Sequence, residues 1–239
     1  LIVPMKIREV LLAIPSISRM QRNEIINRLE PYPVLVRSVP GVSELAQGKL
    51  KIDDLNVVGI NDLLGRDPVP PNQNYIKSNI ANKVVMITGA GGSIGSELCR
   101  QIIQLQPKKI VLFEQSEFSL YAIDQELIGM KLNIDVVPIL GSILNTPLVE
   151  RVCRKFCIQT IYHAAAYKHV PMIELNNFSG VDNNIFGTLS CAEAASSANV
   201  ETFVLISTDK AVRPTNTMGA TKRFAEMILQ ALSQRYSGK

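Results

Sequence analysis

The chain has 239 residues, of which 46% are hydrophobic and 19% charged, and its formal net charge is +4. This composition is typical of a soluble globular protein. Its basic residues are scattered and few aromatic residues lie among them, which argues against nucleic-acid binding. No apolar run reaches the roughly 20 residues of a membrane span, and no signal-peptide pattern is found. The four cysteines do not have the spacing of a metal site or a disulfide framework, so we expect no metal and a reducing, cytoplasmic compartment.

Residues 1–66 predict a first unit with the order strand, helix, strand. The expected strands cover residues 9–15 and 33–39, and the expected helix covers residues 18–29. This order is that of a partial Rossmann-like β-α-β unit, and it has no glycine-rich turn. Prolines at positions 68, 70 and 71 then predict a linker, which we place over residues 67–81.

Residues 82–239 predict a second unit in which strands and helices alternate. Right-handed crossovers between such strands produce a doubly wound parallel sheet of the α/β class, with ligands at the carboxyl ends of the strands. The expected strands are 84–88, 109–113, 135–140, 160–164 and 202–206, and the expected helices are 93–104, 116–127, 145–156, 181–197 and 217–235.

A glycine-rich turn over residues 88–97 separates the first expected strand of this unit from the first helix. The glycines let the backbone turn tightly and approach a pyrophosphate, and the start of the helix offers free N–H groups to the phosphates. The order strand, turn, helix therefore predicts a dinucleotide site. Its expected cofactor-binding residues are Gly89, Gly91, Gly92, Ser93, Ile94 and Gly95.

Glu114 ends the second strand of this unit, about 20 residues beyond the turn, where an acidic residue accepts the adenosine ribose hydroxyls. A carboxylate at this place repels a 2′-phosphate and favours NAD over NADP. The neutral residues Gln115 and Ser116 leave NADP open, and a solvated loop acid is the alternative for Glu114.

The strand at 160–164 leads into a run of alanines, Ala164, Ala165 and Ala166, which lets the backbone pass close to a flat cofactor. His163 is expected to be a hydrogen-bonded core histidine. Lys168 and His169 follow in the loop that faces the crevice, where they either bind a substrate diphosphate or lie in solvent.

The last strand ends in Ser207 and Thr208, and Lys222 lies in the next helix. This layout resembles the extended branch of the short-chain dehydrogenase/reductase (SDR) superfamily, in which a Ser or Thr ends this strand and Tyr-x-x-x-Lys begins the helix. The Gly89–Gly92–Gly95 spacing and the segment Asn184–Thr188 also resemble that branch. Met218 stands at the tyrosine position, and a thioether has no proton to exchange.

Residues 207–222, 163–171 and 88–97 closely resemble the membrane-anchored, CapD-like nucleotide-sugar 4,6-dehydratases of polysaccharide biosynthesis, whose long members carry Met at that position. The resemblance implies a bacterial lyase that converts UDP-N-acetylglucosamine to a 4-keto-6-deoxy sugar with a recycled NAD(P) cofactor. It also implies a homo-oligomer at the cytoplasmic face of the inner membrane, held there by segments outside this chain. Because the chain starts at Leu1 and ends after a helix, we expect a soluble fragment that lacks its sugar-binding part and is inactive alone.

The resemblance also implies roles for five residues. Thr208 hydrogen-bonds the C4 oxygen of the sugar, and Lys222 holds the nicotinamide ribose while Met218 replaces the tyrosine. Asp209 is the acid and Lys210 the base of water elimination, and burial near Lys222 together with the oxidised nicotinamide would supply the lowered pKa that a neutral Lys210 needs. A surface Asp-Lys pair is the alternative.

The group that takes the C4 hydroxyl proton is either Tyr167 or a water chain that ends at Lys222 or Asp209, and we favour the water chain. Two further readings stay open. One is a nucleotide-sugar epimerase or 4-dehydrogenase on the same fold, and the other is a non-catalytic NAD(P)-binding module.

Overall fold

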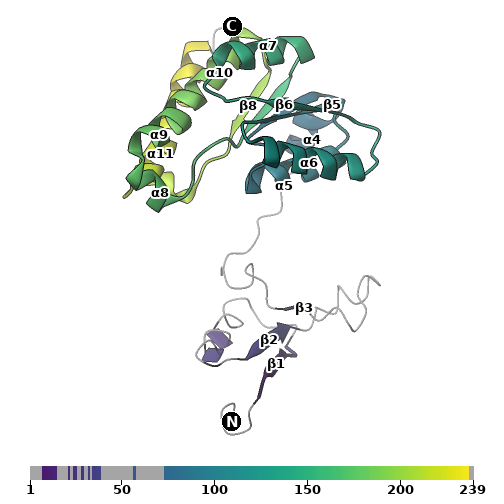
Figure 1. Cartoon of the computed structure of the whole chain (residues 1–239), viewed down its shortest axis with the longest axis vertical. Helices are drawn as coiled ribbons and strands as arrows, with labels where there is room; N and C mark the ends of the chain where they lie inside the picture. Colours follow the sequence, from purple (N-terminus) through teal and green to yellow (C-terminus); the bar gives the residue numbers. More distant parts are fainter. Residues whose placement is uncertain are drawn as a thin grey trace. The chain divides into compact units, whose positions relative to one another are not determined.

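The computed structural model describes residues 7–14, 21, 24–25, 28–29, 32, 34–38, 56–57 and 73–236 (Figure 1). The chain divides into two compact units, Leu1–Pro71 and Asn72–Lys239, and each is described by itself. Among the described residues, no helix is both long enough and apolar enough to cross a membrane.

In the first unit, β1 (Glu9–Leu12) pairs in parallel with β2 (Leu35–Ser38), and Val10 lies opposite Val36. Between the two strands, the described residues 21, 24–25 and 28–29 are helical, and Arg28 forms an i,i+4 ion pair with Glu24. The expected strand–helix–strand order is therefore confirmed, although most of the expected helix lies outside the described residues. The sequence did not predict β3 (Asn56–Val57), which pairs antiparallel with β2.

The second unit is built on a five-stranded parallel sheet with the strand order β6-β5-β4-β7-β8. The chain runs outward from β4 to β6 and then returns to place β7 on the other side of β4, so the order reverses between β4 and β7. This is the doubly wound Rossmann topology that the sequence predicts. The strands are β4 (Val84–Thr88), β5 (Lys109–Glu114), β6 (Asp135–Leu140), β7 (Thr160–His163) and β8 (Thr202–Leu205).

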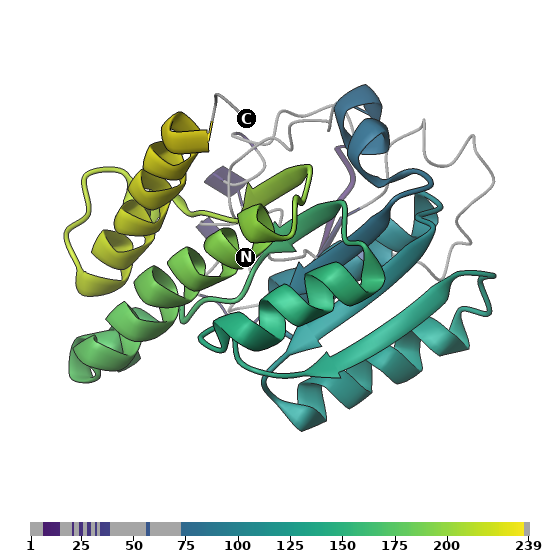
Figure 2. The ribbon, with the colours of Figure 1, turned by 90° about the horizontal axis from the view of Figure 1, so that it is seen from above.

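Helices cover both faces of this sheet (Figure 2). Since side chains alternate along a strand, Val85 and Ile87 pack toward α5 (Ser93–Gln104) and α6 (Glu117–Gly129). Val84 and Met86 pack on the opposite face, toward α7 (Thr146–Phe156) and α10 (Gly187–Ser197). Every residue of β4 is buried, which explains its continuous apolar sequence.

The start of the second unit corrects the predicted linker. Residues 73–80 form α4 (Gln73–Ile80), although the sequence placed them in the linker 67–81. Ile80 is 1% exposed and packs in the core, and the Thr160 hydroxyl donates to the Asn79 carbonyl at 2.7 Å. The short helix therefore belongs to the second unit, because its apolar side closes the end of the sheet.

The region after β7 also differs from the prediction of one helix over 181–197. It contains α8 (Val170–Leu175), α9 (Asn177–Val181), a π-helical turn η1 (Asp182–Phe186) and then α10. A second short turn, η2 (Asp209–Ala211), follows β8 and precedes α11 (Thr217–Tyr236). These elements cover the carboxyl ends of β7 and β8 and carry most of the residues discussed below.

Candidate cofactor and catalytic site

The glycine turn after β4 packs directly on the loop after β7. Gly89 has φ +67°, and a Cβ atom at this position would lie 2.8 Å from the backbone N and Cα of Ala165. Both the left-handed conformation and the close approach therefore require glycine. Because β4 and β7 are neighbours at the point where the strand order reverses, the turn and the alanine run meet there.

The first turn of α5 has no side-chain cap. Gly92 precedes the helix, and its carbonyl accepts the first bond of the helix, from Ser96 N at 2.8 Å. The N–H groups of Ser93, Ile94 and Gly95 consequently have no acceptor within the helix. They lie at the positive end of the helix dipole, which favours an anion such as a phosphate.

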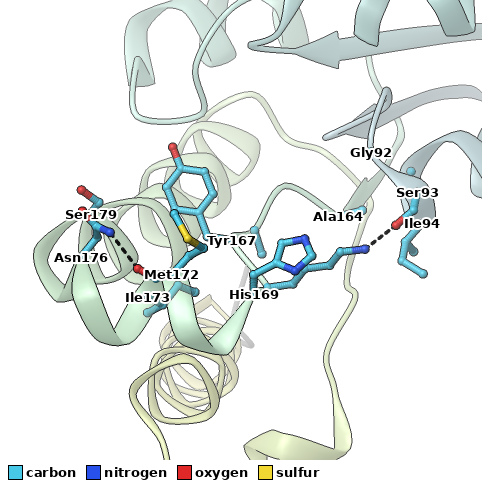
Figure 3. Close-up of a pocket in the computed structure, with 13 residues that line it drawn as sticks. Gly92, Ser93, Ile94, Ala164, Tyr167, His169, Met172, Ile173, Asn176 and Ser179 are labelled. Carbon is cyan, nitrogen blue, oxygen red and sulfur yellow. Dashed lines mark hydrogen bonds between the residues drawn. The ribbon is translucent and has the colours of Figure 1, made fainter.

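A cavity of about 510 Å³ opens in front of this helix start (Figure 3). Ser93 and Ile94 lie on one side of it, Met172 and Asn176 of the α8–α9 region lie on the other, and His169 lies between them. Lys168 also lines the cavity, and its Nζ donates to Ser93 Oγ at 2.5 Å. The Lys168 ammonium group is therefore at the anion-favouring end of α5.

Glu114 lies on a second, smaller cavity of about 150 Å³, together with Gly89 and the alanine run. Its side chain is 8% exposed, so it is not a solvated loop acid. One carboxylate oxygen accepts from Gly91 N at 3.1 Å, and the other accepts from Gln115 N and Ser116 N at 2.9 and 3.0 Å. These bonds fix the carboxylate between the glycine turn and the end of β5.

The residues after β8 form a separate group on η2. The Thr208 hydroxyl donates to Asp209 Oδ1 at 3.1 Å and accepts from Lys210 N at 3.4 Å. A Cβ atom on Gly219 would fall on the Lys210 carbonyl oxygen, so this glycine allows α11 to pack closely on η2. Lys210 is exposed, and the burial near Lys222 that the sequence led us to expect is absent from the described structure.

The start of α11 carries Met218 and Lys222, which are 3% and 6% exposed. Lys222 Nζ donates to the carbonyl oxygen of Ile206, at the end of β8, at 2.7 Å. Burial lowers the pKa of Lys222 to about 8, although the nearby Glu226 acts in the opposite direction. Its ammonium form is therefore less favoured than that of a surface lysine, which suits a residue that assists proton movement.

The first residue of α11 is held by a carboxylate from α8. Glu174 accepts from the backbone N–H of Thr217 at 2.6 Å and from its hydroxyl at 2.9 Å. An acidic group at a helix start satisfies a free N–H and is favoured by the helix dipole. No sequence pattern indicated this contact, which joins the cavity-lining helix α8 to the helix that carries Lys222.

His163 is a hydrogen-bonded core residue, as the sequence led us to expect. It is 1% exposed, and its ring nitrogens contact Thr88 Oγ1 at 2.7 Å and Thr188 Oγ1 at 3.1 Å. Burial and the positive charge of Lys222 lower its pKa to about 3. Tyr167, in contrast, is 43% exposed and lines both cavities.

The structure thus places the predicted site residues in two groups. The glycine turn, Glu114, the alanine run, Lys168 and His169 surround the two cavities. In contrast, Asp209 and Lys210 lie on η2, Thr208 caps that turn, and Met218 and Lys222 lie on α11. The α8 residues Met172 and Ile173 were not predicted to line a cavity, because no sequence pattern indicated that helix. The interior role of Asn184 was signalled only by its motif.

Comparison with known proteins finds relatives named as polysaccharide biosynthesis proteins and as nucleotide-sugar enzymes. The chain is 43% identical over 230 residues to the capsular polysaccharide biosynthesis protein CapD of Staphylococcus aureus, covering 96% of this chain and 38% of CapD. It is 29% identical over 163 residues to a UDP-glucose 4-epimerase of Rickettsia rickettsii, covering 66% of this chain and 46% of that protein. It is 27% identical over 150 residues to a UDP-N-acetylglucosamine 4,6-dehydratase (inverting) of Campylobacter jejuni, covering 62% and 43%.

Solved structures share the architecture. Pen from Bacillus thuringiensis matches with a TM-score of 0.61 and 32% identity, over 65% of this chain and 48% of that one. DesIV, a dTDP-glucose 4,6-dehydratase from Streptomyces venezuelae solved with NAD and TYD bound, matches with a TM-score of 0.57 and 20% identity, over 64% and 52%. The second match shows the fold alone.

The sequence profile of the polysaccharide biosynthesis protein family matches residues 85–239. The chain spans about two fifths of the length of its relatives CapD and EpsC of Bacillus subtilis, at 38% and 39% of each. With its Rossmann fold and its identity to CapD, the chain belongs to the CapD-like polysaccharide biosynthesis proteins of the SDR superfamily.

Proposed function

We propose that the protein is a nucleotide-sugar 4,6-dehydratase that converts UDP-N-acetylglucosamine to a 4-keto-6-deoxy sugar for surface polysaccharide. The observation that carries the proposal is the placement of Thr208, Asp209 and Lys210 on a turn packed against the helix of Lys222. An epimerase needs hydride transfer but no acid and base for water loss. The Campylobacter jejuni relative, named as a UDP-N-acetylglucosamine 4,6-dehydratase, supports the same reaction.

The two cavities fit a nicotinamide dinucleotide, since a Cβ at Gly89 would fill the close approach between the turn and the alanine run. In this proposal the N–H groups of Ser93, Ile94 and Gly95 bind the pyrophosphate and Lys222 holds the nicotinamide ribose. The cofactor would supply reversible hydride transfer, from C4 and back to C6 of the sugar, and C5 regains a proton as the hydride returns, so that the cycle is redox-neutral. The carboxylate of Glu114 accepts the adenosine ribose hydroxyls and disfavours a 2′-phosphate, which makes NAD the preferred form.

Lys168 is assigned to the cofactor in this proposal. The sequence suggested a substrate diphosphate as its partner, but its bond to Ser93 holds its ammonium beside the pyrophosphate end of α5. His169, which directly precedes α8 and lines the larger cavity, is the candidate for the substrate diphosphate.

Water loss uses the η2 residues. Thr208 hydrogen-bonds the C4 oxygen, Lys210 removes the C5 proton next to the new ketone, and Asp209 protonates the C6 hydroxyl, which leaves as water. Because Lys210 is exposed in this structure, the burial that favours its neutral amine has to come from the bound sugar.

The C4 hydroxyl proton has two candidate acceptors, because Met218 has no exchangeable proton. We favour water that leads to Lys222 or Asp209 over the phenol of Tyr167. Tyr167→Phe should then leave turnover almost intact, and a loss of about 10²-fold or more would assign the role to Tyr167.

The test of the function is product analysis by NMR, with the full-length protein, NAD and UDP-N-acetylglucosamine. A 4-keto-6-deoxy product is expected. A C4 epimer would instead identify an epimerase, and cofactor binding without turnover would identify a non-catalytic module. Asp209→Asn should still allow the substrate to reduce the cofactor, seen at 340 nm, but should stop water loss. Normal dehydration by this variant would remove Asp209 from its role.

The site of action belongs to the same proposal. We expect a homo-oligomer at the cytoplasmic face of the inner membrane. Membrane fractionation and analytical ultracentrifugation of the full-length protein test this expectation, and a monomer that stays in the soluble fraction would contradict it.

A further inference from the structure

A chain of hydrogen bonds between buried polar groups connects the end of β4 with the start of α11, and at Asn184 it passes from the backbone carbonyl to the side-chain amide of that residue. The proposed chemistry assigns none of these side chains a role with the substrate or cofactor. Their exposed fractions are all between 0% and 2%. The chain consists of Thr88, His163, Thr188, Asn184 and Thr221, which are here named the β4–α11 network.

The hydrogen positions in the first half of the network follow from its bonds. The Thr188 hydroxyl donates to the backbone carbonyl of Asn184 at 2.7 Å, so its lone pair accepts from His163 Nε2–H at 3.1 Å. The other ring nitrogen, Nδ1, is then an acceptor and receives the Thr88 hydroxyl hydrogen at 2.7 Å. This arrangement needs a neutral imidazole, and burial lowers the pKa of His163 to about 3.

The second half depends on the side-chain amide of Asn184, which the π-helical turn η1 carries. Its Nδ2 donates to Thr221 Oγ1 and to the Tyr167 carbonyl, both at 3.0 Å. Its Oδ1 accepts from Tyr167 N at 2.8 Å and from Asn183 Nδ2 at 3.1 Å. Both hydrogens and both lone pairs of the amide are therefore used. The Thr221 hydroxyl donates in turn to the Met218 carbonyl at 2.7 Å.

The two ends of the network adjoin the glycine turn and Lys222. Thr88 immediately precedes the glycine turn at Gly89, and Thr221 immediately precedes Lys222. A fully satisfied buried network has one low-energy arrangement, because any shift of one member leaves a buried donor or acceptor without a partner. A displacement at one end is consequently opposed at the other.

We propose that the β4–α11 network is a positioning device, centred on a neutral His163, that fixes the glycine turn relative to Lys222. Its members are positioning residues. In terms of the proposed function, on which this step rests, the network sets the span between the pyrophosphate end of the cofactor site and its nicotinamide end.

The first test is a double-mutant cycle on unfolding of this chain in urea, which does not depend on the function. Thr88→Val and Thr221→Val remove the two end hydroxyls with little change in shape, and each should lower the equilibrium constant for folding about tenfold. Because the first substitution already loosens the network, the two effects should not multiply. The folding equilibrium constant of the double variant should fall about 20-fold, rather than the about 100-fold expected for independent sites.

The matched control is Thr160→Val. Thr160 is a fully buried threonine of β7 whose hydroxyl bonds to Asn79 outside the network. Combined with Thr221→Val, it should give a multiplicative loss. If the Thr88–Thr221 pair is multiplicative as well, the two ends act independently and the proposal is overturned.

The second test asks whether the network sets the span of the cofactor site. ADP reaches only the adenosine half of this site, whereas NADH reaches both halves. Thr88→Val and Thr221→Val should each weaken NADH binding at least about fivefold more than ADP binding, and Thr160→Val should weaken neither. Equal weakening of both ligands by both variants would indicate general damage and refute the positioning role. If the unsubstituted chain binds neither ligand, the proposed cofactor site fails, while the unfolding cycle still decides on the network.

Discussion

Replacing Lys222 by methionine should stabilise the protein at neutral pH while weakening its cofactor site. The Lys222 ammonium is 6% exposed, and burial lowers its pKa from 10.5 to about 8. At ~1.4 kcal/mol per pH unit, this difference corresponds to ~3 kcal/mol of folding free energy. Since the pKa of the folded state is the lower one, the cost is present in full below pH 8 and disappears as the pH rises to 10.5.

Lys222→Met removes this cost but also removes the bond to the Ile206 carbonyl, which contributes ~1–2 kcal/mol. At pH 7 the unfolding free energy of the variant should therefore be ~1–2 kcal/mol higher than that of the parent protein. At pH 10.5 only the lost bond remains, so the variant should be the less stable protein. Urea unfolding followed by far-UV circular dichroism at both pH values measures the difference, and NADH titration should show at least about tenfold weaker binding.

Subtracting the unfolding free energies of the two proteins at each pH cancels the contributions of the other titrating groups. Lys108→Met is the control, because Lys108 is exposed and its replacement should have the same small effect at both pH values. Lys222→Met and the parent protein should differ in unfolding free energy by an amount that changes from pH 7 to pH 10.5. An unchanged difference would refute the assignment of a buried, destabilised ammonium.

Three further substitutions test the site geometry. Gly89→Ala should lower the unfolding free energy by at least ~1–2 kcal/mol and abolish NADH binding, because Gly89 has φ +67° and its Cβ would clash with Ala165. Gly129→Ala is the control and should be tolerated, because a Cβ at Gly129 meets open space. Similar effects of the two substitutions would contradict this account. Glu174→Ala should lower unfolding free energy by ~1 kcal/mol by uncapping α11, and an unchanged urea midpoint would argue against the cap. Lys168→Met should weaken NADH binding about tenfold, and an effect confined to the nucleotide sugar would return Lys168 to the substrate.

The fold of the second unit could be predicted because its signals are local. Short apolar runs bounded by turn signals predicted the observed bounds of β4 and β6, and the glycine turn predicted the start of α5. The errors concern segments whose structure depends on distant contacts. α4 follows a proline-rich stretch and is held by Asn79 and Ile80 against the sheet, and α8 is a short helix with a proline in its first turn.

The candidate site shows the same division. Residue type and spacing identified Gly89, Glu114, Thr208 and Lys222, because glycine conformation and side-chain chemistry are properties of the residues themselves. The burial of Lys222 and the exposure of Lys210 were not available from spacing, since both depend on which elements cover them.

The sequence by itself determined the doubly wound sheet, the dinucleotide turn and the residues after the last strand, because each rests on short-range periodicity or on a motif within one turn. Only the tertiary structure decided how these parts are connected. Thr88, His163, Asn184 and Thr221 are separated by up to 133 positions in the chain and are ordinary polar residues in isolation. They become one buried network because the crossovers of the sheet place β4, β7, η1 and α11 side by side, where each polar group must find its partner among the others.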